Sequence, residues 1–108
     1  MKRNFTTNLF SIALSIITIP VFGQWDSFTT NSAYHHYAVD AVSANVIYAG
    51  GYGGSFLKSA DGGDTWDLLG IGSTDWVNAI HFEDELTGWI VACPGNTDPG
   101  DILKTTDG

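Results

Sequence analysis

The sequence predicts an all-β fold in which short strands are joined by tight turns. Thirteen glycines divide the 108 residues into short segments, and signals for helices are almost absent. The segments between the glycines are rich in Val, Ile, Tyr, Trp and Thr, which favour β-strands. Similar stretches also recur along the chain, as they do in proteins built from duplicated units.

The start of the chain is typical of a secretory signal peptide. A basic N-terminus precedes the apolar run 9–22, which is shorter than the ~20 residues that a membrane-spanning helix needs. Val21 and Gly23 place small side chains before a cleavage point at Gln24. We therefore expect a signal peptide over residues 1–23 and a secreted or cell-surface protein. A membrane anchor is the less favoured alternative.

The first unit, residues 24–70, holds four expected strands. Residues 37–43 (YAVDAVS) are rich in residues that favour strands, and residues 46–50 (VIYAG) form an apolar run after a polar turn. Residues 55–59 (SFLKS) and 65–69 (TWDLL) each follow a glycine-rich stretch. The short distance between these strands favours an antiparallel sheet.

The second unit, residues 71–108, holds three expected strands. Residues 76–82 (WVNAIHF) and 89–93 (WIVAC) are apolar runs bounded by polar segments, and residues 101–105 (DILKT) follow a loop of Gly, Asn, Asp and Pro. Cys93 is the single cysteine, and we expect it to be a small buried apolar residue rather than a nucleophile.

The two units match each other in three places. The pairs, in chain order, are VDAV from residue 39 with VNAI from 77, VIYA from 46 with WIVA from 89, and FLKSADGG from 56 with ILKTTDG from 102. Their offsets are 38, 43 and 46 residues, so the sequence predicts insertions within 83–88 and within 94–100. Insertions in loops between matched strands are expected of duplicated units.

A repeated antiparallel unit of four strands and about 46 residues is typical of a β-propeller blade. We expect residues 24–70 to form a first blade and residues 71–108 a second blade that stops within its last turn. Propellers use roughly four to eight blades. The chain is therefore expected to be an N-terminal fragment, with the remaining blades of the same chain as partners. The alternative is an ordinary sandwich with a chance duplication.

The stretch SADGGDTW has the residues of a self-contained hairpin turn between the third and fourth strands. Asp61 can accept hydrogen bonds from nearby N–H groups, and Gly63 tolerates positive φ. The hydroxyls of Ser59 and Thr65 can tie the strand ends together, and Trp66 supplies an apolar body beneath the turn. We expect all five residues to be structural and none to be catalytic.

The same pattern begins again at Thr105, Asp107 and Gly108. Both copies, with LK directly before each, resemble the Asp-box, also called the bacterial neuraminidase repeat (BNR). The stretch LTGWIV is similar to propellers related to the photosystem II stability and assembly factor. The resemblance covers nearly all of residues 37–108. It implies a sialidase-like propeller in which the Asp-box lies on the outer rim of the blade and is structural.

The charge of the chain disfavours two classes of partner. The formal charge is −8, and removal of Lys2 and Arg3 with the signal makes it −10, with Lys58 and Lys104 as the remaining cations. Nucleic acids and anionic membrane surfaces both bind basic faces. We therefore expect no nucleic-acid partner and, after signal cleavage, no membrane partner.

No motif predicts a cofactor or a metal. His35 and His36 are adjacent and would face opposite ways on a strand, and His81 stands alone, so a zinc-type spacing is missing. The loop 95–101 (GNTDPGD) offers oxygen atoms to calcium, but its residue types are also those of an ordinary turn. We expect no cofactor and no metal, with a calcium loop as the alternative.

The sequence favours a non-catalytic scaffold or a surface that binds a protein or a glycan. Five aromatic residues could stack on sugars or pack on a partner, although aromatic side chains also fill cores. They are Tyr34, Tyr37, Tyr52, Trp76 and Trp89.

The alternative function is the N-terminal part of a glycoside hydrolase. Sialidases hold the substrate carboxylate with three arginines, and no arginine follows residue 23. A sialidase site would therefore lie mostly beyond residue 108. A hydrolase with two carboxylates is a further option, and Asp40, which aligns with Asn78 in the repeat, is the acid to test.

Overall fold

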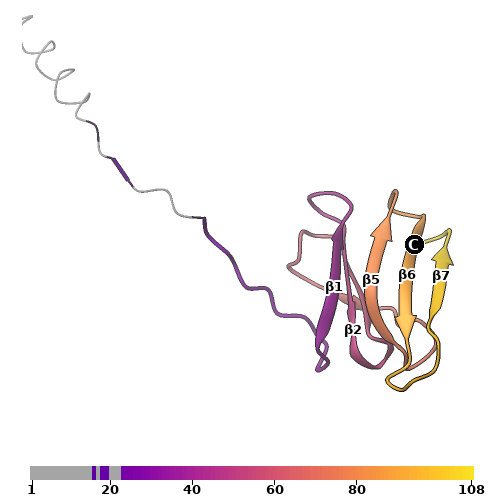
Figure 1. Cartoon of the computed structure of the whole chain (residues 1–108). Helices are drawn as coiled ribbons and strands as arrows, with labels where there is room; N and C mark the ends of the chain where they lie inside the picture. Colours follow the sequence, from indigo (N-terminus) through magenta and orange to yellow (C-terminus); the bar gives the residue numbers. More distant parts are fainter. Residues whose placement is uncertain (1–15, 17, 20–22) are drawn as a thin grey trace, which may run out of the picture.

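The computed structural model of the chain describes residues 16, 18–19 and 23–108. The expected signal peptide, residues 1–23, therefore lies almost entirely outside the described residues. The described part is all-β, with seven strands in two antiparallel sheets (Figure 1). No helix in this part of the chain is long and apolar enough to cross a membrane.

The first sheet has four strands in sequential order. They are β1 (His36–Ala41), β2 (Ile47–Gly51), β3 (Phe56–Ser59) and β4 (Asp67–Leu68). All four expected strands are present, but the fourth is shorter than the predicted 65–69. A 3-10 turn, η1 (Tyr52–Gly54), was not predicted; it joins β2 to β3 and places Gly53 at a φ of 68°.

The second sheet has three strands, also in sequential order. They are β5 (Trp76–Phe82), β6 (Gly88–Cys93) and β7 (Asp101–Thr105), close to the predicted ranges. Within the described residues β7 is an edge strand of this sheet (Figure 1). Its counterpart β3 lies between β2 and β4 in the first sheet.

The register of the sheets corrects the predicted repeat. Ile47 pairs with Ser59 in the first sheet, and Gly88 pairs with Thr105 in the second. Because the third strands correspond at an offset of 46, β2 and β6 correspond at 41 rather than at 43. The pairing of β1 with β2 and of β5 with β6 shows that the first strands, β1 and β5, also correspond at an offset of 41 residues rather than 38.

The corrected offset leaves one insertion instead of two. The turns at residues 42–46 and 83–87 have equal length, so the insertion predicted within 83–88 is absent. All five extra residues lie in the connection between β6 and β7. The predicted equivalence of Asp40 and Asn78 was therefore wrong. A match of four mainly apolar residues can be aligned at several offsets, because strands are built from the same few residue types.

Hydrogen bonds repeat at the corrected offset. The Val42 N–H donates to the Val46 carbonyl over 2.9 Å, and the Glu83 N–H donates to the Thr87 carbonyl over the same distance. Lysine side chains repeat too: the Nζ of Lys58 lies 5.4 Å from the Tyr48 ring centroid, and that of Lys104 lies 4.8 Å from the Trp89 ring centroid. The two units are thus copies in structure as well as in sequence.

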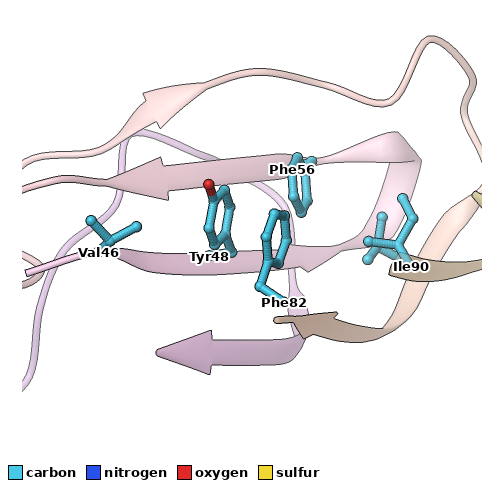
Figure 2. Close-up of a cluster of buried hydrophobic side chains, with 6 residues drawn as sticks. Val46, Tyr48, Phe56, Phe82 and Ile90 are labelled. Atoms are coloured by element: carbon cyan, nitrogen blue, oxygen red, sulfur yellow. The ribbon is translucent and has the colours of Figure 1, made fainter. Parts of the chain in front are cut away.

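The two sheets share one aromatic core (Figure 2). Its buried residues are Val46, Tyr48 and Phe56 from the first unit and Val77, Phe82 and Ile90 from the second. The rings of Tyr48 and Phe82 are parallel within 2°, with centroids 3.8 Å apart. The Tyr48 hydroxyl donates to the Glu85 carbonyl over 2.9 Å, so the polar end of this fully buried ring has a partner.

A second buried cluster belongs to the first sheet alone. Ala49, Leu57 and Trp66 form it, and strand alternation places it on the face opposite Tyr48. The segment before β1 contacts this sheet, because the Asn31 amide donates to the Trp66 carbonyl over 3.1 Å. The apolar residues of the first sheet are thus used on both faces.

Candidate functional site

The SADGGDTW stretch forms a turn whose polar groups bind one another. The Asp61 carboxylate accepts from the Ser59 hydroxyl over 2.9 Å, from the Thr65 N–H over 2.8 Å and from the Thr65 hydroxyl. The Gly63 N–H donates to the Ser59 hydroxyl over 2.8 Å, and the Trp66 indole N–H donates to the Gly63 carbonyl over 2.9 Å. Each predicted residue therefore takes part in the turn.

These bonds also set the ionisation of the exposed acid. Donation from the Thr65 hydroxyl and then from the Thr65 N–H holds the pKa of the Asp61 carboxyl below its ordinary value. A general acid needs a raised pKa rather than a lowered one. The geometry and the pKa shift of Asp61 both suit a structural carboxylate.

In the second copy, residues 105–108 repeat the hydrogen bonds of residues 59–62. The Thr105 hydroxyl donates to the Asp107 carboxylate over 2.9 Å, as Ser59 does to Asp61. The Gly108 N–H donates to the Leu86 carbonyl over 2.9 Å. The corresponding bond of the first unit, from Gly62 N–H to the Asn45 carbonyl, has the same length.

A further pair of repeated side chains was missed by sequence reasoning. The Ser43 hydroxyl accepts from the Val46 N–H over 3.0 Å, and at the equivalent position the Asp84 carboxylate accepts from the Thr87 N–H over 2.7 Å. The N–H groups of Thr87 and Leu86 lower the pKa of Asp84. Ser and Asp before a tight turn are a recognisable signal, but the wrong register hid their equivalence.

Asp40, the acid singled out for catalysis, joins the two sheets. Its carboxylate accepts from the Phe82 N–H over 2.6 Å, and the residue is half-buried. Its register partner in the repeat is His81, which is exposed, and not Asn78. This hydrogen bond gives Asp40 a structural task that the sequence did not reveal.

Four of the five predicted aromatic residues gather at one end of the sheets; we refer to Tyr34, Tyr37, Tyr52 and Trp76 as the aromatic cluster. Ring centroids lie 5.8 Å apart for Tyr34 and Tyr52, 5.2 Å for Tyr52 and Trp76, and 6.0 Å for Tyr37 and Trp76. The three tyrosines remain between 42% and 52% exposed. The fifth, Trp89, lies under Lys104 instead.

Loops from both units support the aromatic cluster. η1 carries Tyr52, the start of β5 carries Trp76, and Gly95 of the β6–β7 connection lies against the Trp76 ring so closely that a Cβ would fall 2.8 Å from it. An exposed surface of tilted rings offers apolar faces and phenol hydroxyls together, as binding surfaces often do.

The remaining polar candidates are not brought together. In the candidate calcium loop, Asn96 and Asp98 bind each other, with the Asp98 N–H donating to the Asn96 side chain over 2.8 Å. His36 contacts the Thr30 hydroxyl, and Cys93 is half-buried rather than fully buried. Among the residues that the structure describes, no three His, Cys, Asp or Glu side chains are placed to hold a metal ion.

Comparison of the sequence with models of protein families gave no match, and comparison with curated proteins gave none at the level of significance applied.

Proposed function

We propose that this chain forms blades of a secreted, non-catalytic β-propeller that serves as a scaffold or as a binding surface for a protein or a glycan. Two successive sheets with one strand order and the same turn hydrogen bonds support the propeller. The rings of Tyr48 and Phe82 stack across the two sheets, and contacts of this type join neighbouring blades of a propeller. The signal-like start of the sequence supports secretion.

The observation that carries the binding role is the aromatic cluster. Its tyrosines are about half-exposed although they lie next to one another, and two of them, Tyr34 and Tyr52, lie in segments between or before the strands at one end of a rigid frame. Loops on such a frame are where binding residues concentrate. The formal charge of −8 repels anionic glycans, so the partner is a neutral glycan or a protein with a neutral or basic surface.

A glycan titration tests this role. The probe is a panel of neutral glucan, xylan and chitin oligosaccharides, and the readout is intrinsic tryptophan fluorescence. Calorimetry then measures the affinity for each oligosaccharide that changes the fluorescence. We expect Trp76→Ala to abolish binding, because it removes the central ring of the cluster. Trp25→Ala is the matched control, since Trp25 is 97% exposed and lies outside the cluster, and it should leave the affinity unchanged. Equal affinities of the two variants would refute the role of the cluster.

Catalysis is tested on the same protein with fluorogenic sialoside and glucoside substrates. Turnover that Asp40→Asn abolishes would overturn the non-catalytic proposal and favour the hydrolase alternative. We expect no turnover above that of the buffer, because the one carboxylate considered for catalysis binds the Phe82 N–H.

A further inference from the structure

A cleft of about 430 Å³ opens between the two sheets beside β7. Phe56 and Leu69 line it from the first unit, and Ile90 and Leu103 line it from the second. The lining is mainly apolar, and Leu103 is 37% exposed although it faces the interior of the two-sheet unit. An apolar cleft of this size next to an edge strand is a place where another chain segment can dock.

The equivalent place in the first unit is occupied. Ala49 pairs with Leu57, and Ile90 pairs with Leu103 in the same register, so the two pairs are counterparts. Trp66 covers the first pair and leaves Leu57 with no exposed surface. The cleft therefore lies where a tryptophan equivalent to Trp66 would sit in the second unit.

The edge of β7 repeats the features that hold β4. In the first sheet Leu57 pairs with Leu68 and Lys58 pairs with Asp67. Leu103 and Lys104 occupy the equivalent positions of β7. An incoming strand with an acid opposite Lys104 and a leucine opposite Leu103 would reproduce both pairs, and the acid would match the charge of the lysine.

The Asp107 carboxylate supplies a further contact. In the first unit Asp61 accepts from the Ser59 hydroxyl and from both donors of Thr65. Asp107 accepts from the Thr105 hydroxyl in the same way. A threonine on the incoming strand would meet this carboxylate as Thr65 meets Asp61.

We propose that the cleft and the edge of β7 together bind a β-strand with the pattern Thr-Trp-Asp-Leu, supplied by a further repeat of this type. The tryptophan fills the cleft against Ile90 and Leu103, and the backbone extends the second sheet by one strand. This inference stands on the register of the two units, so it can fail while the proposed glycan or protein binding at the aromatic cluster survives.

The test adds the strand as a peptide to the 108-residue chain. The probe is a fluorescein-labelled peptide of residues 63–71, GDTWDLLGI, and the readout is fluorescence anisotropy. We expect saturable binding, with increased protection of the β7 amides in hydrogen exchange. The peptide with Trp66→Ala should bind at least about 30-fold more weakly, the loss expected when a buried aromatic anchor is truncated. This comparison leaves the protein itself unchanged.

Two neighbouring positions on β7 locate the binding face. Leu103→Asp places a charge in the cleft and should abolish binding, whereas Ile102→Asp, on the opposite face and 72% exposed, should not change it. Absence of binding, equal binding of the two peptides, or loss with Ile102→Asp but not with Leu103→Asp would each overturn the proposal.

Discussion

The stacked rings of Phe82 and Tyr48 predict how firmly the two sheets are joined. Phe82 is 6% exposed, and the centroid of its ring lies 3.8 Å from that of the Tyr48 ring. Phe82→Ala removes the ring and leaves a cavity between the sheets, which costs about 3–5 kcal/mol of unfolding free energy. Of this, the aromatic pair itself contributes about 0.5–1.5 kcal/mol. Since domains of this kind are stable by about 5–15 kcal/mol, one substitution removes a large part of the total.

Urea unfolding measures the effect. Tryptophan fluorescence and far-UV circular dichroism follow the transition, and coincidence of the two curves shows whether both sheets unfold together. Phe82→Leu retains most of the side-chain volume and should cost less than Phe82→Ala. The control is Val39→Ala on β1, because Val39 is 69% exposed; its effect should stay within about 0.5 kcal/mol.

A double-mutant cycle isolates the stacking. Tyr48→Leu and Phe82→Leu, alone and together, should give a coupling energy of about 0.5–1.5 kcal/mol. An unfolding free energy of Phe82→Ala within about 1 kcal/mol of that of the unchanged chain would refute a cavity between the sheets. A coupling energy of zero would refute the stacking contribution even if the single substitutions are costly.

Two more predictions concern carboxylates. Because the pKa of Asp61 is lower in the folded than in the unfolded chain, its contribution to stability is fully present above about pH 4 and is lost as the pH falls through the folded-state pKa. The urea midpoint of Asp61→Asn should therefore depend less on pH in that range, and an unchanged pH dependence would contradict the hydrogen-bonded turn. Asp40→Ala should cost about 1–3 kcal/mol, because it leaves the Phe82 N–H without its acceptor, whereas Asp40→Asn retains an acceptor and should cost less; denaturation of both variants measures the difference.

The strands and the turn could be predicted from the sequence because their signals are local. Glycines and β-branched residues mark all seven strands, and the bonds around Asp61 join residues at most four positions apart. The 3-10 turn η1 was missed because YGG is also an ordinary loop sequence. The predicted alignment of the two units was wrong because short apolar segments match at several offsets. The pairing of Ile47 with Ser59 and of Gly88 with Thr105 decides among these offsets.

The contacts between the units could not be predicted, because they join residues far apart in the chain. Nothing in the sequence pairs Tyr48 with Phe82 or Asp40 with the Phe82 N–H, 42 positions away. The same holds for the aromatic cluster. The sequence offers five candidate rings, and only the fold brings four of them together and leaves Trp89 apart.

Over the three strands that match, the second unit differs in length from the first by a single insertion, which lies between β6 and β7. Each unit therefore has one end at which the turns are constant and one end at which the connection varies in length. At the constant end, the turns after the first strands have the same length in both copies, and residues 105–108 keep the hydrogen bonds of residues 59–62. At the other end, the four residues 52–55 correspond to the nine residues 93–101. Lengthening a loop costs little, about 0.6 kcal/mol per doubling. Each copy can therefore change its surface near the aromatic cluster while the frame that holds it stays fixed.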